Sequence, residues 1–179
     1  MTNQLEIKLL SENTTMPKRD RLDAGYDIYS AETVILEPQE KAVIKTDVAV
    51  NIPEGYVGLL TSRSGVSSKT HLVIETGKID AGYQGNLGIN IKNDIGTLQD
   101  EYNSFLDDDG NVIEGYLLRD IKGKYLKDCH VIPQSYGIKK GDKLAQLVIV
   151  PIWTPELKEV EEFSYVSERG ADGFGSTGY

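Results

Sequence analysis

The stretch TGKIDAGYQG, residues 76–85, places an acid and an aromatic side chain among three glycines. Asp80 could accept a proton from a water molecule, and Tyr83 could lay its ring against a sugar. An aspartate in a glycine-bounded hairpin also commonly bonds to its own backbone in an Asx turn. On this stretch alone, both interpretations of Asp80 stay open.

Two other stretches carry groups suited to binding an anion. In TSRSGVSSK, Arg63 offers a planar guanidinium for phosphate oxygens, Ser64 a hydroxyl and Gly65 an amide that an anion can approach closely. The alternative is a surface arginine beside a turn. In GDKLAQL, Gln146 interrupts an otherwise apolar strand. A buried amide without partners is costly, so Gln146 bonds either to backbone or to a ligand.

Two more stretches have both a structural and a functional interpretation. In LDAGYDIYSA, Asp23 and Asp27 are either solvated turn acids or, for Asp27, a partner of a metal-bound water. The glycine-rich tail ERGADGFGSTGY is either a frayed end or an arm that closes over a ligand. A closing arm could use Arg169 for charge, Phe174 for stacking, and glycine amides with Ser176 for hydrogen bonds to phosphate.

The elements that must position these residues are predicted to be β-strands. Short runs rich in β-branched residues recur between Gly, Pro, Asn and Asp, namely KAVIKTDVAVNI, GYVGLLT, LGINIKN and KLAQLVIVPIW. This rhythm predicts an all-β sandwich or barrel. Turn residues in LEPQEK, IPEGY and KKGDK separate the runs. The best helix candidate is SGVSSKTHL, where we expect Ser64 to cap one or two turns.

One segment interrupts this rhythm. Residues 93–118 contain no Lys or Arg while acidic residues accumulate, so we interpret residues 94–136 as an acidic insertion. Within it, DDDGN followed by VIEGYLL predicts a turn leading into a strand. A calcium-binding EF-hand loop is excluded, because Phe105 and Tyr116 would occupy its first and last ligand positions.

Composition narrows the classes of function. The chain of 179 residues has 28 acidic and 19 basic residues and a formal charge of −9, which argues against general nucleic-acid binding. A single cysteine excludes an internal disulfide. The N-terminal sequence lacks the apolar core of a signal peptide, and no window has the apolar length of a membrane span. We therefore expect a soluble, cytoplasmic protein of one domain with an insertion.

Five stretches occur together in one order: DAGYDIYSAE, RSG, GKIDAGYQG, GDKLAQL and RGADGFGSTG. This order resembles the five motifs of the trimeric dUTPase family. The resemblance implies a jelly-roll-like β-barrel from residues 1–93 and 137–168, carrying the insertion 94–136. It also implies a flexible C-terminal arm, residues 169–179, that closes the active site. The expected assembly is a homotrimer whose sites lie at subunit junctions.

The resemblance also implies an activity and residue roles. The reaction would be the Mg²⁺-dependent hydrolysis of dUTP to dUMP and pyrophosphate, with Asp80 activating the water that attacks the α-phosphorus. The metal would be held by phosphate oxygens and water, with Asp27 at most a partner through water. The residues expected to bind substrate are Arg63, Ser64, Gly65, Ile79, Tyr83, Gly88, Gln146, Arg169, Phe174, Gly175 and Ser176.

Two departures from the family pattern leave alternatives open. Lys143 stands where many members have Arg, which keeps the charge but loses the bidentate geometry. The insertion 94–136 resembles an extra segment of some phage dUTPases, certain of which bind repressors of mobile genetic elements. A nucleotide-sensing regulator that binds a repressor is therefore one alternative, and a phage protein would act in the host cytoplasm. A dCTP deaminase is another, although the five motifs lack the glutamate that it needs.

Overall fold

The computed structural model describes residues 4–12, 14–96, 104–106, 112–114, 118–126, 134–168 and 170–171. These residues form fifteen β-strands and one short helix, which confirms the all-β prediction. In the described ranges, no helix combines the length and the apolar character needed to cross a bilayer.

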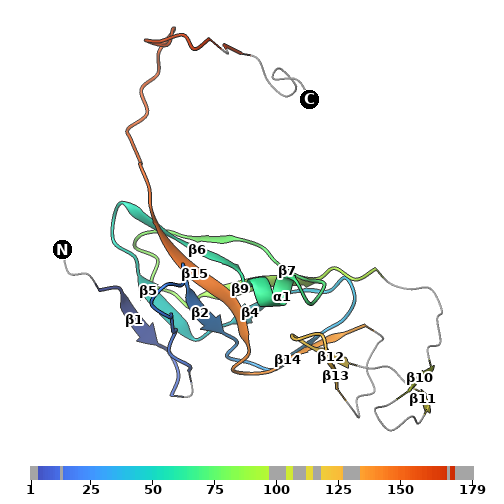
Figure 1. Ribbon diagram of the computed structural model, residues 1–179. Helices are drawn as coiled ribbons and strands as arrows, with labels where there is room; N and C mark the ends of the chain where they lie inside the picture. The colour runs from blue at the N-terminus through green and yellow to red at the C-terminus, as the bar shows by residue number, and fades with distance from the viewer. Residues whose placement is uncertain are drawn as a thin grey trace.

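Most strands are short, and the helix lies between the sixth and seventh (Figure 1). In chain order the elements are β1 (Glu6–Leu9), β2 (Tyr26–Tyr29), β3 (Val34–Leu36), β4 (Lys41–Lys45), β5 (Val48–Asn51), β6 (Tyr56–Ser62), α1 (Ser64–Ser67), β7 (Leu72–Ile74), β8 (Gly77–Ile79), β9 (Gly88–Asn93), β10 (Ser104–Leu106), β11 (Val112–Glu114), β12 (Leu118–Asp120), β13 (Tyr125–Leu126), β14 (Tyr136–Ile138) and β15 (Lys143–Pro151).

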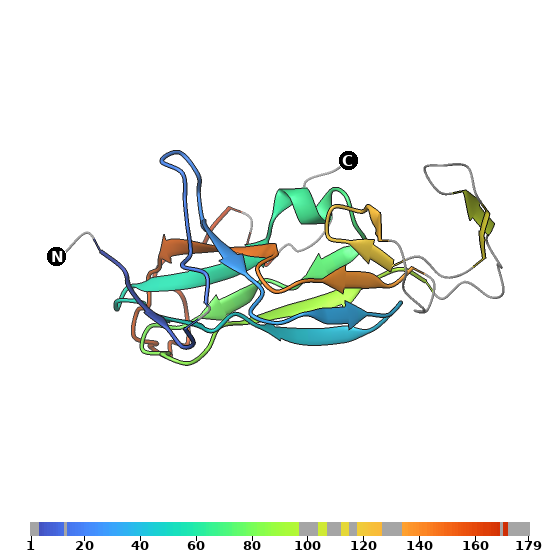
Figure 2. The same cartoon turned by 90° about the horizontal axis from the view of Figure 1, so that it is seen from below.

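Two sheets supply much of the core. One has the strand order β2-β15-β6-β8 and the other β4-β9-β7, and Figure 2 shows the strands packed in layers. Ile28 and Leu147 from the first sheet and Ile89 and Ile91 from the second are fully buried in one hydrophobic cluster. The described strands form separate open sheets rather than one closed barrel, an arrangement consistent with a jelly roll.

The predicted runs fold as the alternation of their residues requires. In β9, Ile89 and Ile91 face the core while Gly88 is exposed, as a half-buried strand demands. The run at 41–52 contains β4 and β5, and the run at 143–153 contains β15. The run at 55–61 covers β6 except for its last residue, Ser62. The turn glycines Gly55 and Gly141 have φ of +82° and +88°, which a residue with a side chain adopts only at a cost.

The predicted helix is present, but its predicted cap is wrong. Arg63 occupies the cap position in an extended conformation, Ser64 is the first helical residue, and no side chain caps the helix. The amide of Arg63 donates to the carbonyl of Leu144 on the neighbouring strand at 3.4 Å. This tertiary contact, and not a serine hydroxyl, sets where α1 begins.

The predicted insertion is joined to the core at both ends by a buried asparagine. The Asn93 side chain, at 0% exposure, donates to the carbonyls of Leu36 and Gln134 and accepts from the amide of Ile95. Because Ile95 lies near the start and Gln134 near the end of residues 94–136, one side chain fixes both.

The described parts of this segment form two hairpins. β10 and β11 pair only with each other, and β11 confirms the strand predicted after the Asp-Gly pair, whose turn lies outside the described residues. The other hairpin, β12–β13, joins the core sheet in the order β13-β12-β14-β3. Part of the predicted insertion therefore continues the core.

Beyond β15 the chain runs away from the packed strands (Figure 1). Trp153, Leu157 and Phe163 are 87%, 97% and 83% exposed. Apolar side chains this exposed are covered by no part of their own chain among the described residues.

Candidate active site

The Asp27 carboxylate contacts residues from two of the other stretches singled out in the sequence. Asp27 on β2 lies opposite Gln146 on β15. Its Oδ1 is 2.8 Å from Nε of Arg63, just after β6, and its Oδ2 is 2.9 Å from Nζ of Lys143. Nε2 of Gln146 donates to Oδ1 over 3.5 Å. Among the described residues, the Gln146 side chain thus bonds to a carboxylate of another candidate site residue.

The electrostatics of this cluster keep its members ionised. Burial acts to raise the pKa of Asp27, but the hydrogen bond from Lys143 and the charges of Arg63 and Lys143 outweigh it and hold the pKa below its usual value. The pKa of Lys143 is raised, first by its hydrogen bond to Asp27. Nε of Arg63 is buried and forms an ion pair without an aligned hydrogen bond, so the guanidinium is held by charge.

The residues after Arg63 face open space. Ser64 and Gly65 are exposed, and a Cβ placed on Gly65 would meet no atom within 4 Å. Packing within the chain therefore does not require glycine here, and the exposed Gly65 leaves room for an approaching anion. We call Asp27, Arg63, Ser64, Gly65, Lys143 and Gln146 the cationic half-site.

The second group of candidates lies on the hairpin after β8. The Asp80 carbonyl accepts from the amide of Tyr83 at 3.1 Å, and Gly82 has a φ of +87°, so backbone closes the turn. The Asp80 side chain is exposed and has no hydrogen bond or ion pair among the described residues. The Asx-turn interpretation is therefore wrong for this structure, and the carboxylate points into solvent.

Two glycines of this hairpin lie where a side chain would clash with a neighbouring side chain. The Tyr83 hydroxyl donates to the Asn86 carbonyl at 3.0 Å, and a Cβ on Gly85 would lie 2.5 Å from that hydroxyl. A Cβ on Gly88 would lie 2.6 Å from the Val43 side chain. We call Ile79, Asp80, Tyr83 and Gly88 the hairpin half-site.

A pair that sequence reasoning missed anchors the hairpin half-site. Asn86 accepts from the Asp47 amide at 2.9 Å, and its Nδ2 donates to the Asp47 carboxylate at 3.0 Å. Asp47 has a φ of +54°, which is uncommon for a residue other than glycine. No local pattern in TDVAV signals that conformation, so the sequence offered no sign of it.

The two half-sites lie at different ends of one strand. Ile79 pairs with Gly58 in β6, while Arg63 follows the other end of β6, five residues further on. At the usual rise per residue in a strand, this is a separation of about 16 Å. A single chain therefore does not bring Asp80 to the groups around Arg63. The remaining candidates Arg169, Phe174, Gly175 and Ser176 lie outside the described residues.

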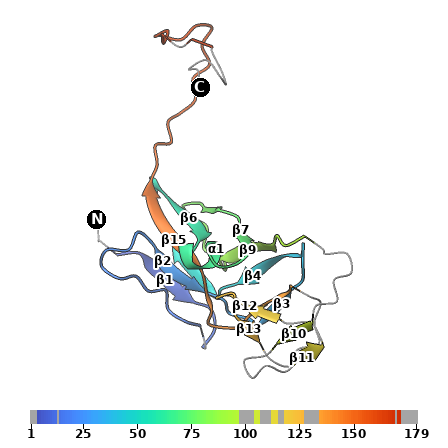
Figure 3. The same cartoon turned by 45° about the vertical axis from the view of Figure 1, so that its right-hand side comes forward.

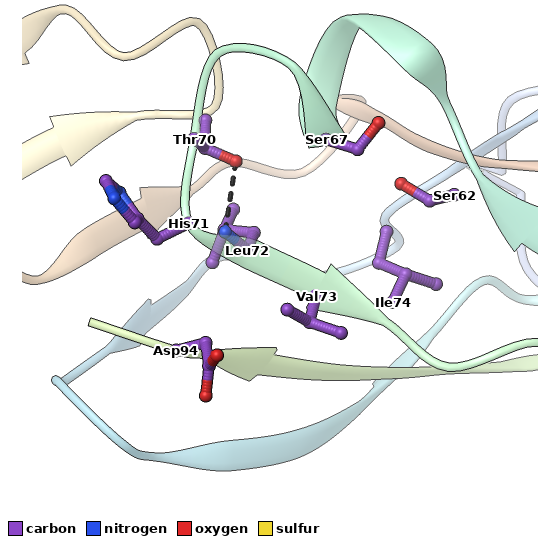
Figure 4. A pocket seen from close by; sticks show the side chains of 8 residues that line it. All are labelled: Ser62, Ser67, Thr70, His71, Leu72, Val73, Ile74 and Asp94. Carbon is purple, nitrogen blue, oxygen red and sulfur yellow. Dashed lines mark hydrogen bonds between the residues drawn. The ribbon is translucent and has the colours of Figure 1, made fainter. Parts of the chain in front are cut away.

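A pocket of about 320 Å³ opens beneath α1 and beside β7 (Figure 4). It is lined by Ser62, Ser67, Thr70, His71, Leu72, Val73, Ile74 and Asp94. Thr70 accepts a hydrogen bond from the Leu72 amide at 3.1 Å. In the described residues, no group of three or more His, Cys, Asp or Glu side chains is placed to hold a metal ion.

The family model of dUTPase matches residues 12–97 and 130–178. The chain belongs to the dUTPase family. The unmatched stretch 98–129 falls within the predicted insertion, and the matched stretches contain both half-sites. The resemblance to the dUTPase family seen in the sequence is therefore confirmed.

Curated and solved dUTPases are similar over nearly the whole chain. The human mitochondrial deoxyuridine 5'-triphosphate nucleotidohydrolase is 35% identical over 98% of the chain, which spans 55% of the length of that protein. The structure of Staphylococcus bacteriophage 80alpha dUTPase with dUPNHPP is 65% identical, with a TM-score of 0.85, covering 99% of this chain and 100% of that one. A mutant dUTPase from phage phi11 of S. aureus, described as coordinating a structural Mg(II) ion, is 65% identical with a TM-score of 0.79, covering 91% and 100%.

Proposed function

We propose that this protein hydrolyses dUTP to dUMP and pyrophosphate through a water molecule activated by Asp80. The observation that carries the proposal is the exposed Asp80 carboxylate on a hairpin, with no hydrogen bond or ion pair among the described residues, in a chain that also holds a separate cationic cluster. A base and a phosphate grip are the two parts that this reaction requires of a protein. Membership of the dUTPase family supplies the substrate.

In the proposed mechanism, Asp80 accepts a proton as the water oxygen bonds to the α-phosphorus. The bond from the α-phosphorus to the bridging oxygen breaks, and pyrophosphate leaves with that oxygen. Arg63, Ser64, Gly65 and Gln146 hold the α- and β-phosphates and stabilise the charge on the leaving group. These groups position and stabilise, and Asp80 moves the only proton.

The hairpin half-site would select the nucleoside. Tyr83, 47% exposed, presents its ring to the deoxyribose, where a ribose 2′-hydroxyl would clash. Ile79 and Gly88 would bring backbone groups to the uracil edge. Because the exposed Gly88 has no side chain, the base can approach its backbone closely. From the C-terminal arm, Arg169, Phe174, Gly175 and Ser176 would contact the γ-phosphate and the base as the arm closes.

The residues of the cationic half-site fit magnesium that arrives with the triphosphate. Its carboxylate, Asp27, is only 14% exposed and already contacts Arg63 and Lys143. The cations Arg63 and Lys143 suit phosphate oxygens, and the Asp27 carboxylate would accept a hydrogen bond from a metal-bound water. When bound, magnesium neutralises part of the triphosphate charge.

We further propose that the protein is a homotrimer whose active sites each combine half-sites from different chains. The separation of about 16 Å along β6 between the half-sites of one chain supports this assembly. So do the exposed Trp153, Leu157 and Phe163 after β15, which a neighbouring subunit would cover.

The direct test is an assay of released pyrophosphate with dUTP, using dCTP, dTTP and UTP as controls. We expect hydrolysis of dUTP alone, since the close approach of Gly88 excludes a 5-methyl group and Tyr83 excludes a 2′-hydroxyl. Release of ammonia from dCTP would instead identify a deaminase. Equal rates with all four nucleotides would contradict the assignment of the hairpin half-site.

A second proposed role is binding a repressor of a mobile genetic element through residues 94–136, in the host cytoplasm if the protein is phage-encoded. Similar phage dUTPases are described as controlling transfer of virulence genes. β10–β11, which pairs with no other described strand, is the part of the insertion most separate from the core.

This role predicts that the two activities can be separated. Replacing residues 97–117 with a short Gly-Ser linker removes β10–β11 but keeps the β12–β13 hairpin, so hydrolysis should persist. Release of such a repressor from its DNA, measured by gel mobility shift, should be lost. Undiminished release by the shortened protein would exclude this segment as the contact.

A further inference from the structure

The helix that carries the proposed phosphate-binding groups is held weakly by its own residues. α1 has four residues, no side-chain cap, and one buried side chain, Val66. The pocket of about 320 Å³ beneath it, lined in part by Ser67 and Thr70, leaves that side unfilled (Figure 4). The position of Arg63, Ser64 and Gly65 therefore depends on what holds the ends of α1.

The segment that follows α1 is closely tied to the helix. The Val66 carbonyl accepts from the amides of Lys69 and Thr70 at 3.3 and 3.1 Å, and from the Thr70 hydroxyl at 2.8 Å. The next amide, that of His71, donates to the hydroxyl of the buried Tyr136 on β14 at 3.1 Å. A displacement at Lys69 is therefore transmitted to α1.

The β12–β13 hairpin meets this segment from the other side, and Figure 2 and Figure 3 show it beside α1. Its turn is rigid, because the Asp120 carboxylate accepts from the amides of Lys122 and Lys124, each at 2.9 Å. Ile121 belongs to the hydrophobic core, and β12 pairs with β14. The hairpin is thus a fixed part of the core and not a loose loop.

Gly123 brings the hairpin against the segment that follows α1. Gly123 has a φ of +76°, and a Cβ placed there would lie 2.7 Å from the Lys69 carbonyl oxygen. Real Cβ atoms do not come this close to backbone, so only glycine allows the approach. The turn of the hairpin, at Gly123, therefore packs directly against the Lys69 peptide group, just after the end of α1.

We propose that Gly123 and the β12–β13 hairpin are positioning elements for the phosphate-binding turn, so that the predicted insertion contributes to the affinity for triphosphate. The inference rests on the proposed function of Arg63, Ser64 and Gly65. It adds that residues outside the family motifs fix the positions of these three groups. Since coupling is reciprocal, occupation of the phosphate site also stabilises the contact between Gly123 and Lys69.

The test compares Gly123→Ala with Gly55→Ala. Both glycines lie in turns at nearly equal positive φ, +76° and +82°, so both variants carry similar backbone strain. A Cβ on Gly55 meets nothing within 4 Å, whereas one on Gly123 pushes on Lys69. The readouts are KM and kcat for dUTP, the inhibition constants of pyrophosphate and deoxyuridine, and the urea midpoint of unfolding.

We expect Gly123→Ala to raise KM for dUTP and the inhibition constant of pyrophosphate by about fivefold or more. The inhibition constant of deoxyuridine, which has no phosphate, should not change, and Gly55→Ala should match the wild type in all three. Equal effects of the two variants, or an equal effect on deoxyuridine, would overturn the inference, because strain alone would then explain the result.

Arg63→Ala separates this inference from the function on which it rests. If Arg63→Ala leaves pyrophosphate inhibition unchanged, the phosphate assignment itself fails. If Arg63→Ala weakens it and Gly123→Ala does not, only the hairpin inference fails. Should Gly123→Ala not fold, Asp120→Ala loosens the same turn without a steric clash, and it must weaken pyrophosphate inhibition for the inference to hold.

Discussion

Asp80→Asn is expected to lower kcat for dUTP by about a hundredfold to ten-thousandfold while dUTP still binds. Asparagine keeps the shape of the side chain but cannot accept the proton of the attacking water. Because Asp80 has no hydrogen-bond or ion-pair partner among the described residues, the fold should be unaffected. Pyrophosphate release measures kcat, and calorimetric titration with Mg²⁺ and dUTP measures binding.

Asp20→Asn provides the matched control. Asp20 is also exposed, and its side chain likewise has no interaction among the described residues, but it lies in neither half-site. It should retain the turnover of the unmodified protein. If Asp80→Asn kept most of its kcat, Asp80 would not be the base, and another group would have to activate the water.

The turn that carries Asp80 and Tyr83 could be predicted from the sequence because its geometry is local. Gly82 must adopt a positive φ, and Gly85 must leave room for the Tyr83 ring, so residue type and spacing nearly determine the turn. The same holds for β9, where alternation alone assigns Ile89 and Ile91 to the core. Such features involve residues close together in the sequence, so the local sequence pattern predicts them.

The features that the sequence did not predict depend on contacts between distant residues. The start of α1 was placed one residue late, since the position of Arg63 is fixed by Leu144 and Asp27 from other strands. The parallel pairing of β12 with β14 joins part of the insertion to the core, and nothing in their residue patterns specifies that partner. Residue types alone cannot choose among such pairings.

The distance between the half-sites, which became visible only in the structure, leads to the second large effect. Subunits carrying Asp80→Asn and subunits carrying Arg63→Ala should each form nearly inactive trimers. Unfolded together in urea and refolded as a mixture, they should recover activity. In mixed trimers, the intact hairpin of an Arg63→Ala subunit meets the intact cationic half-site of an Asp80→Asn subunit.

The recovery can be estimated from random assembly. In the proposed trimer each site draws its hairpin and its cationic groups from two different chains, so an equal mixture should restore about a quarter of the sites. Mixing Asp80→Asn with Tyr83→Ala provides the control, because both changes damage the same half-site and no combination restores it. If the first mixture stayed inactive, each site would be built within one chain. The separation of Ile79 from Arg63 along β6, about 16 Å, is the reason to expect recovery instead.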